Sequence, residues 1–160
     1  MKTLRLILGD QLNHDHSWFD ETNSNVLFVM MEVRQETDYA PHHIQKVVSF
    51  FSAMRTFAEE MSSKGLRFQY IHLNDEHNKQ SIPENLSQII KKEQIEHFEY
   101  QLPDEYRLDE QLQAFCKQLD ISWKAVNSEH FYTMRDELSE FFEGKKTYLM
   151  ESFYRHMRKK

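Results

Sequence analysis

Short apolar runs alternate with longer amphipathic stretches along the chain. Strand patterns occupy residues 4–8, 26–31, 66–73, 95–101 and 121–126. The first three are apolar runs, as in strands buried in a parallel sheet. The stretches between the strands place apolar residues at three- and four-residue spacing, as amphipathic helices do. The alternation predicts a Rossmann-like, doubly wound α/β fold, with a five-stranded, mostly parallel sheet flanked by helices.

The clearest helix pattern runs from Pro41 to about Lys64. One stripe along it is predicted to be buried, and its members are Ile44, Val47, Val48, Phe51, Met54, Ala58 and Met61. Pro41 suits a first turn, where its missing N–H costs nothing, and Gly65 suits the stop after the last turn. Further helices are expected over residues 83–93, 104–119 with Asp104 as the N-cap, 134–142, and 148 to the end.

Length and composition limit the possible classes of protein. The chain has 160 residues, 39% of them hydrophobic, with three glycines and three prolines, which favours one helix-rich globular domain. The formal net charge of -6 argues against a nucleic-acid surface made by this chain alone. A single cysteine excludes an intrachain disulfide and any iron–sulfur cluster bound entirely by this chain.

The apolar runs are shorter than the roughly 20 residues that span a bilayer. Met1 leads straight into a strand pattern rather than a signal peptide. We therefore expect a cytoplasmic protein with no membrane partner.

Polar residues follow the first two expected strands. Gly9, Asp10 and Gln11 come after the first strand, and Glu32 ends the second. Open α/β sheets bind ligands at the carboxyl ends of their strands. Asp10 and Gln11 could hydrogen-bond a neutral heterocycle or a ribityl chain. Glu32 could accept from the N–H groups of a flavin-like ring, or be a solvated strand end.

The loop after the second strand extends this polar edge. It carries Glu36 and Tyr39, and His42 and His43 precede the long helix. Tyr39 could stack on a ring or pack against the sheet edge. Adjacent helical residues point about 100° apart, which makes the histidine pair a poor chelator. We expect no metal site here, and either histidine could contact a ligand.

Motifs for catalysis and for phosphate binding are missing. Residues 8–12, LGDQL, lack the glycines of a dinucleotide fingerprint and the lysine of a P-loop. No Gly-x-Ser-x-Gly elbow occurs, and Cys116 lies in the apolar pattern of a core helix. We therefore predict no catalytic residue in this chain.

Five stretches, taken in order, resemble the deoxyribodipyrimidine photolyase-related family, the bacterial iron–sulfur photolyases and cryptochromes. The stretches are residues 6–12, 31–57, 64–72, 100–107 and 142–158. Together they extend over nearly the whole chain. The resemblance implies an N-terminal α/β domain over residues 1–144, with residues 145–160 starting a linker or helix towards an absent helical domain.

The same resemblance implies a function. In this family the α/β domain binds an antenna chromophore, a ribityllumazine in the better-known members, which passes excitation to FAD; the expected antenna here is 6,7-dimethyl-8-ribityllumazine. FAD, the iron–sulfur cluster and the DNA contacts would belong to the absent domain, so this chain alone should repair no DNA. The parent would be a light-dependent repair enzyme of the (6-4) type or a cryptochrome-like protein. The antenna-contacting residues implied by position are Gly9, Asp10, Gln11, Glu32, Glu36, Tyr39, His43 and Val47.

Two alternatives stay open at the level of sequence. One is a stand-alone nucleotide-binding α/β protein, which the architecture allows and the missing phosphate loop disfavours. The other is an interaction domain that docks through an aromatic face formed by Tyr148, Phe153 and Tyr154. The oligomeric state is not predicted.

Overall fold

A computed structural model describes all residues from 1 to 160 and separates them into two compact units, Met1–Ser128 and Glu129–Lys160. The first unit is an α/β sheet domain and the second contains two short helices. The boundary expected after residue 144 falls inside the second unit.

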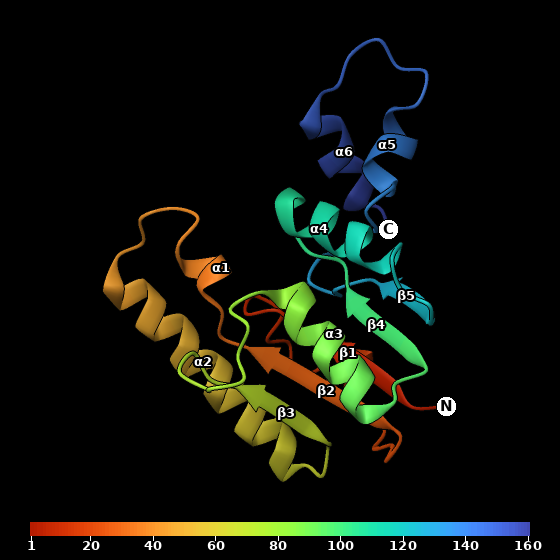
Figure 1. The fold of residues 1–160 in the computed structure, drawn as a ribbon. Coiled ribbons are helices and arrows are strands. Elements are labelled where there is room, and N and C mark those ends of the chain that lie inside the picture. The colour runs from red at the N-terminus through yellow and green to blue at the C-terminus, as the bar shows by residue number, and fades with distance from the viewer. The chain divides into compact units, whose positions relative to one another are not determined.

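The first unit is built on five parallel strands in the order β3-β2-β1-β4-β5 (Figure 1). Their bounds are β1 Thr3–Leu6, β2 Val26–Met31, β3 Phe68–Ile71, β4 His97–Gln101 and β5 Ser122–Val126. Every strand pair is parallel, so the predicted Rossmann-like α/β fold is confirmed. All six residues of β2 are buried, as a strand covered on both faces requires.

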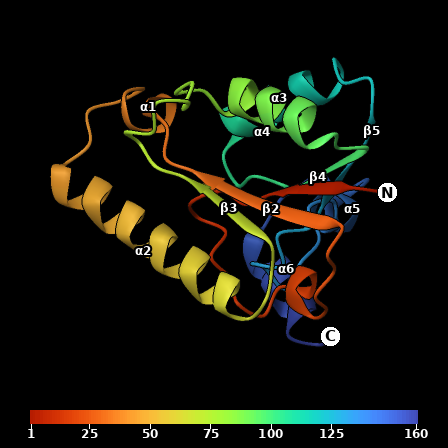
Figure 2. The ribbon, with the colours of Figure 1, turned by 60° about the horizontal axis from the view of Figure 1, so that its bottom comes forward.

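Alternate residues of the strands enter two separate cores, one on each face of the sheet. Leu27 and Val29 pack with Leu86 and Leu112 on the face covered by α3 (Ile82–Glu93) and α4 (Tyr106–Cys116). Phe28 and Met30 pack on the opposite face against α2 (Ile44–Ser63). Figure 2 shows α2 on one side of the sheet, with α3 and α4 on the other.

Helix α2 differs from its prediction in two ways. Pro41 lies outside it, because His43 is the N-cap and its Nδ1 accepts from the Gln45 N–H at 3.2 Å. Ile44 and Val48 are 68% and 56% exposed, because the first turns of α2 extend past the ends of the strands (Figure 2). Only the later part of the stripe is buried. It comprises Met54, Ala58 and Met61, with Phe57 added.

The ends of the other helices were predicted less well. Helix α4 begins at Tyr106 with Glu105 as its N-cap, so Asp104 is not the cap. The short helix α1 (Arg34–Thr37) and the 3₁₀ turn Ser17–Phe19 were not predicted. Gly65 has φ +87°, a conformation that favours glycine, and it follows the C-cap of α2 as expected.

The second unit holds α5 (Glu137–Phe142) and α6 (Met150–Met157), which contact each other through aromatic rings. The rings of Phe141 and Phe153 lie 5.3 Å apart, and the Lys145 ammonium lies 3.2 Å from the Phe141 ring centroid. Phe153 is therefore buried, whereas Tyr148 and Tyr154 are exposed. The aromatic face expected from the sequence is divided between the inside of the unit and its surface.

None of the helices combines the length with the apolar composition that is needed to span a bilayer.

Cys116 allows a simple check of the packing around α4. Its thiol is buried in the core, and burial raises its pKa to about 11. We expect a thiol-specific disulfide reagent at pH 8 to leave the folded protein unmodified and to label it once in urea, because the thiolate is the reactive form. Rapid labelling of the folded protein, followed by absorbance, would contradict this packing.

Candidate functional site

A cavity of about 200 Å³ lies at the carboxyl ends of β1 and β2. The chain leaves β1 and β4 in opposite directions across the sheet, and such switch points are where open α/β sheets hold ligands. Leu8 and Gly9 after β1 line the cavity on one side of this point, and Glu105 and Leu108 after β4 line it on the other. The start of α2 completes the wall.

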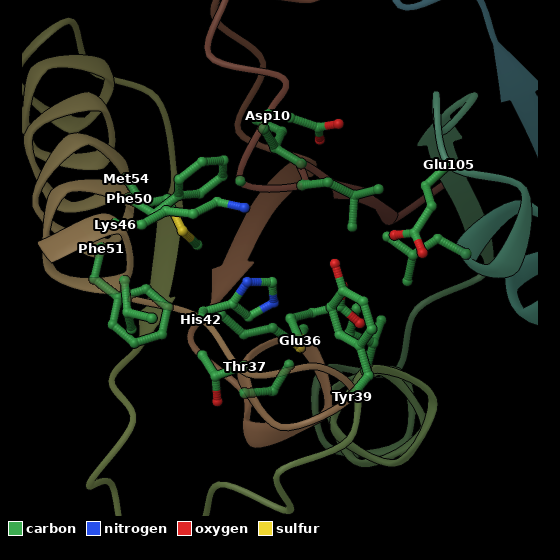
Figure 3. Close-up of a pocket in the computed structure, with 18 of the residues that line it drawn as sticks. Asp10, Glu36, Thr37, Tyr39, His42, Lys46, Phe50, Phe51, Met54 and Glu105 are labelled. Carbon is green, nitrogen blue, oxygen red and sulfur yellow. The ribbon is translucent and has the colours of Figure 1, made fainter. Parts of the chain in front are cut away.

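The cavity combines an apolar base with polar groups. Apolar side chains from three elements form the base, and they include Leu6, Met31, Val33, Phe51 and Met54. The polar lining residues are Asp10, Glu36, Thr37, His42, Lys46 and Glu105. In Figure 3, Lys46 and Phe50 lie on the α2 side, and Tyr39 and Glu105 lie across from them.

Gly9 lets the loop after β1 approach α2 closely. A Cβ atom at this position would lie 3.0 Å from Met54 Sδ and 3.3 Å from the Phe50 ring. Any larger residue would therefore displace these side chains. Because both of them line the cavity, Gly9 helps to set its width.

Five of the eight predicted contact residues line this cavity. They are Gly9, Asp10, Glu36, Tyr39 and Val47. The other three, Gln11, Glu32 and His43, are not part of its lining. Whether the five bind a chromophore stays a prediction.

Gln11 braces the loop after β1. The side chain is buried, its Oε1 accepts from the Leu8 N–H at 3.0 Å, and its Nε2 donates to the Gln101 carbonyl at 3.2 Å. The amide thus ties the loop after β1 to the end of β4. Its oxygen and nitrogen are engaged within the protein, so the expected contact with a heterocycle or ribityl chain is not supported.

Glu32 is the centre of a buried polar network. Its carboxylate accepts two hydrogen bonds from Arg55, at 2.6 and 2.8 Å, one from the Tyr70 hydroxyl at 2.8 Å, and one from the Leu73 N–H at 2.9 Å. Burial raises the pKa of this carboxyl, but the hydrogen bonds outweigh it and hold the pKa below its ordinary value. Glu32 joins β2 to α2, to β3 and to the loop after β3. These contacts account for a carboxylate at this position without solvation of the strand end and without a flavin-like ring.

His42, rather than His43, lies at the cavity. The His43 ring caps α2, whereas the His42 ring lies 5.1 Å from that of Tyr39, edge to face, and lines the cavity. Nowhere in the structure do three or more His, Cys, Asp or Glu side chains form a group that could hold a metal ion.

Several lining residues were missed by the sequence analysis. Lys46, Phe50 and Met54 recur at four-residue spacing on α2, so that spacing could have assigned all three to one face. Glu105 comes from beyond β4. Only the strand order brings it next to the residues after β1 and β2, and no local pattern signals it.

Arg107 lies outside the cavity lining and contacts two acidic residues that belong to it, Glu36 and Glu105. Its guanidinium donates to Glu36 at 2.9 and 3.2 Å and to Glu105 at 2.9 and 3.1 Å. Its Cζ atom lies 4.4 Å from the centre of the Tyr39 ring. The hydrogen bond with Glu36 is the main reason why the pKa of Arg107 is raised above its ordinary value.

Comparison with known proteins agrees with this architecture. Residues 5–160 match the profile of the family described as deoxyribodipyrimidine photo-lyase-related protein. A (6-4) photolyase from Agrobacterium fabrum is 32% identical over 161 residues. The alignment includes all of this chain and 32% of that protein, so the chain spans about a third of the length of this curated relative. The chain belongs to the deoxyribodipyrimidine photo-lyase-related protein family.

Proposed function

We propose that this chain binds an antenna pigment of the ribityllumazine class, 6,7-dimethyl-8-ribityllumazine, in the cavity at the carboxyl edge of the sheet. The observation that carries the proposal is one cavity with an apolar base and polar groups from several elements around it. Ligand sites typically combine an apolar lining with a few polar groups that fix orientation.

The chemistry of the lining suits such a pigment. A lumazine has a flat two-ring system with an imide N–H, carbonyl groups and a hydroxylated side chain. Phe50 and Met54 offer apolar contact to the flat ring. Asp10 and Glu36 can accept from its N–H or hydroxyl groups, and Lys46 can donate to its carbonyls.

Size and charge disfavour the nucleotide alternative. The cavity of about 200 Å³ is smaller than the roughly 300–1,000 Å³ of ordinary small-molecule sites, so it has less room for a dinucleotide than for a compact ring system. Asp10, Glu36 and Glu105 would repel phosphate groups, and the loop after β1 has one glycine where phosphate loops have several.

We further propose that the chain acts within a larger protein devoted to light-dependent DNA repair or to cryptochrome-like signalling, in the cytoplasm. The named activity of the Agrobacterium fabrum relative supports the repair reading. Other parts of such a protein would supply FAD, the iron–sulfur cluster and the DNA contacts, since this chain has one cysteine and a net charge of -6.

A fluorescence titration with 6,7-dimethyl-8-ribityllumazine tests the proposal directly. We expect a saturable change with one ligand per chain, together with an upward shift of the melting temperature, because the ligand binds only the folded state. ATP, NAD and FMN are tested in parallel and should give smaller shifts. Stabilisation by ATP without any effect of the lumazine would reject the proposal in favour of a nucleotide site.

A further inference from the structure

The acidic wall of the cavity is assembled from distant parts of the chain. Glu36 belongs to the short helix α1 after β2, and Glu105 is the N-cap of α4 after β4. Both carboxylates line the cavity, and both accept from the guanidinium of Arg107. Two carboxylates held this close would otherwise repel each other, so the cation between them is what makes the arrangement favourable.

Arg107 also links α4 to the segment that covers this side of the cavity. Residues 34–43 run from α1 through Tyr39 to the start of α2. Within this segment Arg107 contacts Glu36 through two hydrogen bonds and the ring of Tyr39 through its flat face. Planar, two-pronged contacts of this kind depend on the shape of the guanidinium as well as on its charge.

A second set of contacts shows that the first residues of the segment are fixed independently. Gln35 donates to Gln111 at 2.6 Å and accepts from the Ile82 N–H at 3.1 Å. These bonds fasten the start of α1 to α3 and α4. Beyond Gln35, the contacts of Arg107 with Glu36 and Tyr39 are those that join the covering segment to α4.

We propose that Arg107 is a positioning residue for the cavity, holding Glu36, Glu105 and Tyr39 in the places where a ligand meets them. It forms no part of the cavity lining and acts only through these three side chains. The role in ligand binding rests on the proposed function, whereas the role in holding residues 34–43 does not. When Arg107 is lost, the segment spends part of its time in conformations that cannot bind, and the apparent affinity falls by that fraction.

Three measurements on three variants test the proposal. Hydrogen exchange is followed at the amides of Glu36 and Asp38 in the segment, which donate to the carbonyls of Val33 and Arg34. Lumazine affinity and the absorption band of the bound ligand are recorded on the same samples. The variants are Arg107→Met, Arg107→Lys and, as a matched control, Arg67→Met. Arg67 is exposed and donates to the Ser24 carbonyl outside the cavity lining.

For Arg107→Met we expect exchange in residues 34–43 to be about tenfold faster and the lumazine Kd to be about tenfold higher. A tenfold higher Kd is expected if only about a tenth of the protein is in the conformation that can bind. The bound absorption band should move towards that of the free ligand, because Glu36 and Tyr39 no longer hold the ring. The amides of β2, which lies in the core, serve as the internal reference and should be unchanged. Arg67→Met should match the wild type in every measurement.

Arg107→Lys separates charge from shape and gives a second variant if the methionine protein does not fold. Lysine keeps the cation but cannot bridge both carboxylates with a planar fork, so we expect it to stay at least about threefold weaker in affinity. Full restoration by lysine would overturn the bridging role. Unchanged exchange in residues 34–43 of Arg107→Met, or faster exchange with unchanged affinity, would overturn the positioning role.

The failure of the proposed function has a distinct signature. If the wild type binds no lumazine, the affinity and absorption measurements are lost for all variants alike. The exchange measurement then decides alone whether Arg107 holds the segment.

Discussion

Replacing Glu32 with alanine is expected to lower the free energy of unfolding by about 3 kcal/mol, near the lower end of what removing one partner of a buried ion pair costs. Glu32 is fully buried, and its loss leaves the Tyr70 hydroxyl and the Leu73 N–H without their acceptor. Arg55 is 48% exposed and can be hydrated instead, which is why a larger loss is not expected. Urea denaturation measures the change.

The control for this experiment is another carboxylate whose partner is exposed. Glu60 contacts His14 at 2.6 Å, and both side chains are about half exposed. Glu60→Ala should therefore change the stability by no more than about 0.5 kcal/mol. Equal effects of Glu60→Ala and Glu32→Ala would show that the Glu32 network does not stabilise the fold.

The same network predicts how stability depends on pH. The folded-state pKa of Glu32 lies below the ordinary value of 4.5, so the unfolded state binds the proton more readily. The stabilisation is therefore complete above pH 4.5 and is lost as the pH falls through the lower, folded-state pKa. The difference in stability between wild type and Glu32→Gln should shrink over that acidic range, because glutamine does not titrate. A difference that is constant with pH would contradict the assignment.

Replacing Val47 with tryptophan is expected to weaken lumazine binding at least about a hundredfold, or ~2.7 kcal/mol. Val47 lines the cavity from α2, and an indole there would occupy the space of a ring ligand. The helix itself should persist, since Val47 is only partly buried and overpacking then has room to relax. The measurement is the fluorescence titration described above, with circular dichroism to verify the fold.

Val48→Trp is the matched control, because it makes the same substitution one position along the same helix. Val48 is 56% exposed and does not line the cavity. It should bind the lumazine within about threefold of the wild type, since surface substitutions typically change energies by less than roughly 0.5 kcal/mol. Similar affinities in Val47→Trp and the wild type would place the ligand elsewhere.

The sequence predicts the architecture well because burial leaves a local signature. Residues 26–31 form a continuous apolar run, and they are β2, buried on both faces. The ends of elements are less predictable. Pro41 suggests the start of α2, but the imidazole of His43 caps the helix by accepting from the Gln45 N–H, and the helix starts later. The apolar stripe of α2 gives no indication of where the sheet beneath it ends, so the exposure of Ile44 and Val48 could not be foreseen.

The site is predicted in part for the same physical reason. Residues directly after β1 and β2 reach the carboxyl edge by topology, and Asp10 and Glu36 indeed line the cavity. Position alone could not reveal that the carboxylate of Glu32 is taken up by Arg55 and Tyr70. Arg107 was missed altogether, because its importance arises from contacts between residues 71 positions apart in the sequence.

The tight approach at Gly9 has a consequence for how related sequences can diverge. A Cβ atom added at position 9 would lie only 3.0 Å from the Met54 sulfur. A residue larger than glycine is therefore tolerated at position 9 only if the side chain at position 54 on α2 is smaller. Substitutions at positions 9 and 54 are thus not independent. A larger residue at position 9 together with a smaller one at position 54 would change the shape of the base of the cavity while the sheet stays intact. In this way family members can differ in the outline of this cavity without a change of fold.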